Sequence, residues 1–182
     1  MMRIHAVVAR PKTGYRLALA LILGVAAAGI VVPGSGSVAA QTENPCALLM
    51  TDEIQMLTPN EHISDGARAA QSPDSTTCRY TWGAGLGRFT LAVSINTASR
   101  MFAGMNADAI KQVLVSSTMP GTTDAAIPDV GQAAVFKAYS PLYAGASTYL
   151  KDRILEVNLD GFDAREKKGQ LISLLKSAAS RL

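Results

Sequence analysis

The five residues Cys78-Arg79-Tyr80-Thr81-Trp82 combine one of the two cysteines of the chain with its only tryptophan. Hydrophobic side chains at positions 78, 80 and 82 alternate with polar ones at 79 and 81, which is the period of a strand with one buried face. We therefore expect a buried strand here, with the rest of the protein packed around it.

The second cysteine, Cys46, predicts a structural disulfide to Cys78. Two cysteines permit a single internal pairing, and this one would close a loop of 78 − 46 = 32 positions, which contributes about 3 to 4 kcal/mol by the chain-entropy estimate. Two free thiols, a metal pair and a redox dithiol are the alternatives. Redox pairs lie closer in sequence and metal sites need more ligands, so the residues favour the disulfide.

The composition predicts one globular domain, with 48% hydrophobic and 17% charged residues in 182. The net charge of +3 comes from the beginning of the chain, because four basic residues precede Leu17 and no acidic residue occurs before Glu43. From Gln41 onward, 17 − 4 = 13 basic residues face 14 acidic ones, a net charge of −1. This balance gives no electrostatic basis for binding nucleic acid.

Residues 1–40 have the pattern of an export signal peptide: scattered cations, an apolar run from Leu17 to Val32, and small residues at Val38 and Ala40. We predict cleavage after Ala40 and a single domain over 41–182. A retained membrane anchor is the alternative, but the run is shorter than the roughly 20 apolar residues of a spanning helix. A lipid anchor would need a cysteine directly after the small residues, whereas the first cysteine of the sequence is Cys46. We expect a periplasmic or secreted protein with no stable membrane insertion after signal removal.

Periodicity and breaking residues predict an α+β fold, an antiparallel sheet of about five strands with helices packed on it, in the order α-β-β-α-β-β-β-α. Gly83–Gly87 is expected as a hairpin connection rather than a phosphate-binding loop, because a strand follows it. Lys151-Asp152 is expected as a tight turn. The remaining expected elements are a helix opening at Asn44-Pro45, a short second turn from Thr51, a surface loop over 58–76, a strand over 88–97, a helix over 99–116, a loop over 117–129, strands over 133–138, 147–151 and 154–159, and a helix over 163–182 capped by Asp163.

Two helical patterns carry a second interpretation. Met101 and Met105 lie one turn apart, as in some copper(I) sites, but methionine more often fills gaps in a core. The terminal helix has an apolar stripe that suits either a membrane surface or the sheet, and we expect it on the sheet. The stripe is Leu171, Leu174, Leu175, Ala178 and Leu182.

Several short motifs together resemble a domain-of-unknown-function family of small exported bacterial proteins, many of them lipoproteins. They are Pro45-Cys46 with Leu48, Leu49, Thr51 and Glu53, then Cys78, Tyr80 and Trp82, then Val130-Gly131, then Leu155 and Val157 before the final helix. The chain departs from that pattern in lacking the lipid-attachment cysteine and in having Gln132 after the glycine. The resemblance implies export and a cysteine-stapled α/β fold, and it implies no particular activity.

No catalytic, metal or cofactor site is expected from the sequence. His62 is the only histidine after the leader, and a Ser-His-Asp relay would have to use it with Ser64, Asp65 or Ser72. A loose metal site from Glu61, His62 and Asp65 is a weaker alternative. A solvated loop histidine is favoured over both, and the carboxylate pairs Asp52/Glu53 and Asp124/Asp129 have no spacing typical of an acid/base pair.

The connection Tyr139-Ser140-Pro141-Leu142-Tyr143 is unusually apolar and aromatic for a hairpin. Tyrosine provides rigid contact area at interfaces, although the connection could also fold back onto the sheet. We expect an exported, non-enzymatic binding or interaction module that contacts an unknown cell-envelope protein through Tyr139, Leu142 and Tyr143. The alternatives are a hydrolase-type enzyme using His62 and a carrier of a small apolar ligand held between sheet and helix.

Overall fold

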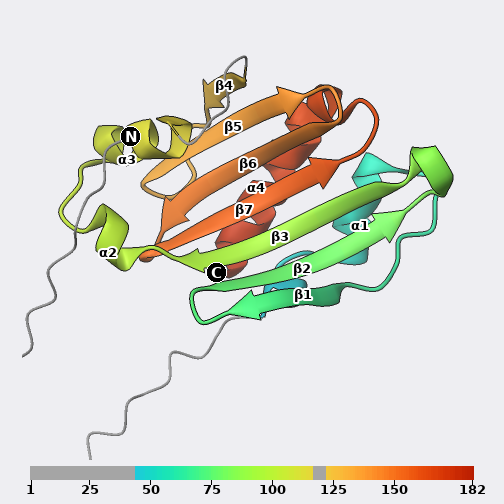
Figure 1. Cartoon of the computed structure of the whole chain (residues 1–182), viewed down its shortest axis with the longest axis horizontal. Coiled ribbons are helices and arrows are strands. Elements are labelled where there is room, and N and C mark those ends of the chain that lie inside the picture. Colours follow the sequence, from blue (N-terminus) through green and yellow to red (C-terminus); the bar gives the residue numbers. More distant parts are fainter. Residues whose placement is uncertain (1–43, 117–121) are drawn as a thin grey trace, which may run out of the picture. The chain divides into compact units, whose positions relative to one another are not determined.

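The computed structural model describes residues 44–116 and 122–182 (Figure 1). The predicted export signal over 1–40 and its cleavage site lie outside the described residues. Within the described ranges, no helix combines the length and apolar character needed to cross a membrane.

Seven strands form one antiparallel sheet in the order β1-β2-β3-β7-β6-β5-β4 (Figure 1). The α+β class is therefore confirmed, but the sheet is wider than the five strands expected. The strands are β1 (Ala67–Ser72), β2 (Ser75–Trp82), β3 (Phe89–Thr97), β4 (Thr123–Ala126), β5 (Ala133–Ser140), β6 (Tyr143–Leu150) and β7 (Arg153–Asp160). The helices are η1 (Pro45–Ala47), α1 (Thr51–Ile54), η2 (Gln55–Leu57), η3 (Gly85–Gly87), α2 (Ser99–Phe102), α3 (Ala107–Ser116), η4 (Ala164–Lys167) and α4 (Lys168–Arg181).

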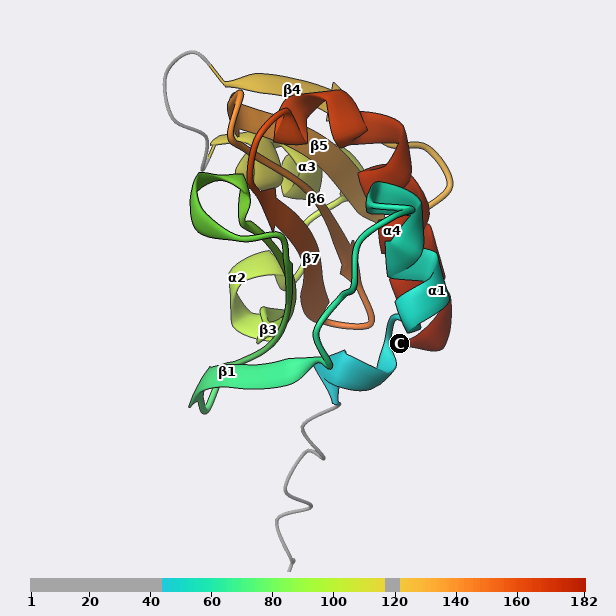
Figure 2. The ribbon, with the colours of Figure 1, turned by 90° about the vertical axis from the view of Figure 1, so that its right-hand side faces the viewer.

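The main core lies between the sheet and α4, which packs on β6 and β7. Helices α1 and α4 lie on the same side of the sheet (Figure 2). The expected apolar stripe of the terminal helix faces the sheet, with Leu171, Leu174 and Leu175 fully buried. This confirms that the terminal helix docks on the sheet.

The stretch 78–82 lies in β2 with Cys78, Tyr80 and Trp82 buried, as predicted. Cys78 forms a disulfide with Cys46, and their Cα atoms are 5.1 Å apart. The hydroxyl of Tyr80 donates to the backbone carbonyl of Cys46 at 3.2 Å. The disulfide and this hydrogen bond hold the N-terminal segment of the domain against the sheet.

Two predicted loops contain strands, so those predictions were wrong. β1 lies inside the predicted loop 58–76, and β4 lies inside the predicted loop 117–129. Neither Ala67–Ser72 nor Thr123–Ala126 has the β-branched and aromatic content typical of strands. They become strands because β2 and β5 offer an open edge to pair with.

The single helix predicted over 99–116 is two helices, separated at Gly104, where φ is +76°. The expected core role of the methionines is wrong, because Met101 is 60% exposed and Met105 is 40% exposed. Phe102, Ile110 and Leu114 form the buried side instead. The break changes the direction of the chain between α2 and α3. A helical pattern that runs unbroken through both helices therefore predicts the wrong buried side.

Smaller differences concern element ends. Asp163 was expected to cap the terminal helix, but it has a left-handed backbone with φ of 56° and its side chain makes no cap hydrogen bond. Asn44 does cap as expected, since its side chain accepts from the N–H of Cys46, although η1 is short. β5 and β6 extend toward each other to Ser140 and Tyr143 and are longer than predicted.

Candidate functional site

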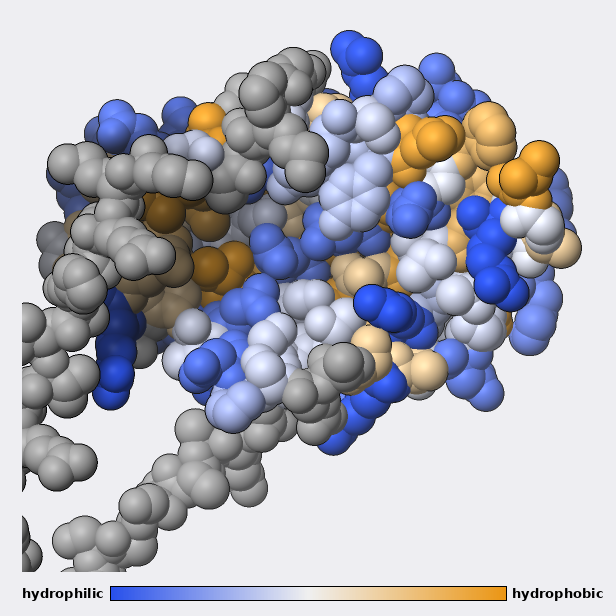
Figure 3. Space-filling model, in the orientation of Figure 1, coloured by the Kyte–Doolittle hydropathy of each residue, from blue (hydrophilic) through white to orange (hydrophobic). Residues whose placement is uncertain are grey.

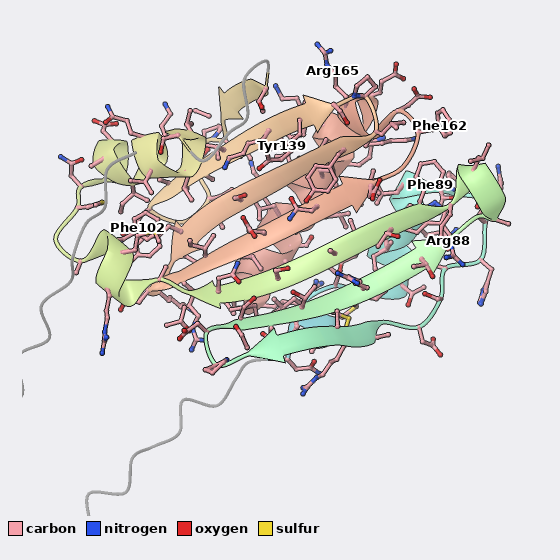
Figure 4. All side chains as sticks on the ribbon, in the orientation of Figure 1. Arg88, Phe89, Phe102, Tyr139, Phe162 and Arg165 are labelled. Atoms are coloured by element: carbon pink, nitrogen blue, oxygen red, sulfur yellow. A yellow bond between two sulfur atoms is a disulfide. The ribbon has the colours of Figure 1, made fainter. Side chains whose placement is uncertain are left out.

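Among the described residues, α2 and α3 cover one end of the second face of the sheet (Figure 1). There Phe102 contacts Tyr149, with ring centroids 4.7 Å apart, and both belong to a small second core with Val135. Figure 4 shows Phe102 under α2 at one end of this face and Tyr139 over its middle. We call the part beyond α2 and α3 the open face.

Strand register explains a hollow in the open face. Ala92 pairs with Asn158, and Asn158 pairs with Gly145, so a row across β3, β7 and β6 carries small side chains on both sides of one asparagine. A Cβ added to Gly145 would collide with Oδ1 of Asn158. The surface is therefore hollow along this row, because the missing side chain of Gly145 leaves room for the amide of Asn158 to lie against the sheet.

The hollow has a volume of about 320 Å³, and we call it the polar trough. It reaches from β2 to β6, three inter-strand steps or about 14 Å. Its lining residues are Arg79, Thr90, Ala92, Tyr143, Asn158 and Asp160. Because five of these six side chains are polar or aromatic, the trough suits a polar ligand better than an apolar one.

Tyr139 and Tyr143 lie in β5 and β6, on either side of the turn at Pro141 and Leu142. Their ring centroids are 5.1 Å apart with the ring planes at 56°, so the two rings form a corner on the open face. Both side chains are half-buried and Leu142 is 47% exposed. The structure thus brings Tyr139 and Tyr143 together, while Leu142 lies at the turn beside them.

The two phenol hydroxyls differ from those of the other tyrosines in the described ranges. Tyr80 donates to a carbonyl, and Tyr149 donates to Oδ1 of Asp152 at 2.9 Å. No hydrogen bond joins the hydroxyl of Tyr139 or Tyr143 to another residue that the structure describes. The hydrogen-bonding capacity of both hydroxyls is therefore unused within the described residues.

Burial and nearby carboxylates make these two phenols weak acids. Burial is the main cause that raises the pKa of Tyr143, followed by the negative charges of Glu156 and Asp160. Burial also raises the pKa of Tyr139, with Glu156 as the next cause. Both tyrosines are therefore neutral donors at physiological pH, in a negative electrostatic environment.

Glu156 lies on the same face, one row beyond the trough. Its Oε2 accepts from Nδ2 of Asn96 at 3.3 Å, and its Oε1 lies 3.5 Å from Oγ of Ser147, a long contact for a hydrogen bond. These contacts hold the carboxylate in place and leave part of its accepting capacity unused.

The end of the sheet next to Tyr143 exposes apolar side chains. The N–H of Gly161 donates to the carbonyl of Leu142 at 2.8 Å, which places the loop with Phe162 beside the turn. Phe162 is 55% exposed, and Figure 4 shows it at this end of the sheet. Figure 3 shows hydrophobic surface in the same region. Leu142 thus belongs to an exposed apolar rim next to the tyrosine corner.

The other sequence candidates are not assembled into a site. His62 is exposed, and no hydrogen bond or ion pair links it to any described residue. The hydroxyl of Ser64 accepts from the N–H of Thr81 at 2.9 Å, which is a structural contact. No three metal-binding side chains of the His, Cys, Asp and Glu types cluster within 44–116 and 122–182. In the carboxylate pair Asp52/Glu53, Glu53 forms an ion pair with Arg181.

Sequence reasoning missed Arg79, Gly145, Glu156, Asn158 and Asp160 as members of one surface. The alternation over 154–159 did indicate that Glu156 and Asn158 lie on a wet face. Placing them beside Tyr143 needs the β6–β7 register, which pairs Tyr143 with Asp160 and Gly145 with Asn158. A search for polar residues at alternate positions in neighbouring predicted strands could have suggested the set.

Comparisons of the chain with protein-family models, with curated proteins and with solved structures find no match. The family resemblance of the sequence motifs therefore stays an expectation.

Proposed function

We propose that the protein is an exported, non-enzymatic binding module, acting in the periplasm or outside the cell, whose contact surface is the open face around Tyr139, Leu142 and Tyr143. One observation carries this proposal: two half-buried phenols stand beside a hollow with hydroxyls unused by the described part of the chain. Tyrosine at such a position combines a rigid apolar ring with a hydrogen-bonding tip, the combination enriched at interfaces.

The surroundings support a partner of mixed character. The trough is polar, whereas Leu142 and Phe162 at its end are apolar and exposed. Protein contacts combine apolar and polar surface in this way. Residence in an oxidising compartment fits the disulfide between Cys46 and Cys78.

An apolar-ligand carrier is less well supported. The layer between the sheet and α4 is filled by Leu155, Leu171 and Leu174, each with no exposed surface. A ligand there would have to displace packed side chains, whereas the open face accepts one without rearrangement.

The proposal is tested by capture of partners from cell-envelope extracts. A variant with alanine at positions 139, 142 and 143 should lose the bound partner that the natural sequence retains. Met50→Ala is the matched control, because Met50 is 58% exposed and belongs to the segment before α1, away from the open face. Partners that bind the triple variant as well as the natural protein would overturn the assignment, provided its circular dichroism spectrum shows it folded.

A further inference from the structure

The end of the polar trough at β6 and β7 carries negative charge that suits a cation. Asp160 lines it, and Glu156 lies four residues earlier on the same face of β7, about 13 Å along the strand. Asn158 is midway between them, with its Oδ1 turned toward Gly145. A positive group above Asn158 would therefore lie between two carboxylates and beside a carbonyl-type oxygen.

The tyrosine corner adds a second, independent preference for the same charge. Tyr143 pairs directly with Asp160 across β6 and β7, so one ring stands next to the carboxylate. The ring planes of Tyr139 and Tyr143 meet at 56°, so their faces can close on one small group from two sides. Aromatic faces carry negative potential and attract ammonium groups within about 6 Å of the ring centroid.

Among the described residues, two cations lie in the row of Gly145 and Asn158, one toward each edge of the sheet. Arg79 lines the far end of the trough, on β2, three strands from Tyr143 in the sheet order. Lys137 pairs with Gly145 on the other side, but it is only 3% exposed and has its own partner in the protein.

We propose that the polar trough binds an organic ammonium group, held by the rings of Tyr139 and Tyr143 and by the carboxylate of Asp160, with Glu156 adding negative potential from the next row of the sheet. This inference rests on the proposed function and gives its ligand a chemical class. The ammonium group belongs either to a small amine or to a lysine side chain of a partner protein, and Arg79 offers a place for an anionic group of the same ligand.

The test is titration of the purified protein with choline, followed by NMR shifts of backbone amides. The matched probe is 3,3-dimethylbutanol, which has the shape of choline with carbon in place of the charged nitrogen. Choline should shift amides of β6 and β7 around Tyr143 and Asn158, and should bind about tenfold more tightly than the neutral probe. Equal affinity for the two probes would overturn the inference, as would shifts confined to other elements.

Variants separate the ring from the hydroxyl. Tyr143→Leu should weaken choline binding about tenfold, whereas Tyr143→Phe, which keeps the aromatic face, should stay within about twofold. Glu156→Gln should weaken it about threefold at low salt, since it removes one negative charge at nearly constant shape. If Tyr143→Leu binds choline as well as the natural protein, the tyrosine corner is not the site.

Two peptides identify the source of the ammonium group. A peptide with one free lysine should bind and its acetyl-lysine version should not, if a partner protein provides the group. Binding of choline without binding of the lysine peptide assigns a small amine. If neither binds while envelope partners are still lost in the triple alanine variant, the ammonium inference fails and the proposed function stands.

Discussion

At the scale of single residues, the core contains one polar atom with an unused hydrogen-bonding capacity among the described residues. Oγ1 of Thr76 is buried on the core side of β2 and has no partner there. We predict that Thr76→Val stabilises the protein by about 1 kcal/mol, because it removes an unsatisfied buried hydroxyl at nearly constant shape. Urea denaturation of both proteins measures the difference.

The neighbouring threonine is the control for that prediction. The hydroxyl of Thr77 lies 2.9 Å from the hydroxyl of Ser94 on β3. Thr77→Val should therefore give no gain in stability, and should leave Ser94 without its partner. A Thr76→Val protein less stable than the natural one would mean that this hydroxyl does have a partner.

Gly145 and Asn158 form a coupled pair on the open face. We predict that Gly145→Ala lowers the free energy of unfolding by about 1 kcal/mol, because the new methyl group forces the Asn158 side chain from its place. In the Asn158→Ala background the same change should cost nothing or stabilise, since alanine is favoured over glycine within a strand. A double-mutant cycle by urea denaturation measures this coupling, and additive effects would contradict it.

At the scale of elements, sequence patterns predicted the strands and helices whose own side chains favour that structure. The alternation of Phe89, Leu91, Val93 and Ile95 predicts β3 within one residue of its observed start. β1 and β4 could not be predicted this way, because their pairing partners and not their own side chains make them strands. The same holds for the trough: its residues are visible in the sequence, but their adjacency comes from the register of four strands.

Helix α4 is joined to α1 by a charged contact that stabilises the fold in a pH-dependent way. Nη1 of Arg181 binds Oε2 of Glu53 at 2.7 Å, and Nη2 binds Oε1 at 2.8 Å. The guanidinium lowers the pKa of Glu53 from 4.5 to about 2, opposed by burial and aided by the N–H of Met50. The Nη1 atom also donates to the carbonyl of Leu48, which ties the end of α4 to the N-terminal segment.

The sign of this effect follows from the lowered pKa. A carboxylate with a lower pKa in the folded state stabilises the fold above the unfolded value, and this contribution is lost as the pH falls from about 4.5 to about 2. We predict that Glu53→Gln costs about 1 kcal/mol at pH 7, the value expected after screening of a partly exposed pair by water. The cost should shrink toward pH 2.

Urea denaturation of both proteins between pH 2 and pH 7 checks this prediction. The control is Glu166→Gln, a change at an exposed position in η4, which should alter the free energy of unfolding by less than about 0.5 kcal/mol at pH 7. A Glu53→Gln cost that is the same at both ends of the pH range would show that shape and not charge accounts for the effect.

At the scale of the whole domain, the disulfide and the α4 contact fasten the same N-terminal segment from two sides. Cys46 is tied to β2 by the disulfide, and Leu48 and Glu53 are tied to Arg181. In the same segment, Leu48, Leu49 and Ile54 complete the core beneath the sheet. The segment covers β2 and β3, so losing it would expose the strands that form one end of the open face.

We predict that replacing both cysteines by alanine lowers the free energy of unfolding by about 3 to 4 kcal/mol, as expected for release of a loop of this length. Because the segment keeps its contact with Arg181, the variant should stay folded, with faster amide exchange first in η1, α1 and β2. Reduction of the natural protein should give the same midpoint in urea as the double variant. If reduction leaves the midpoint unchanged, the two cysteines contribute no cross-link, and the N-terminal segment is held by its packing and by Arg181 alone.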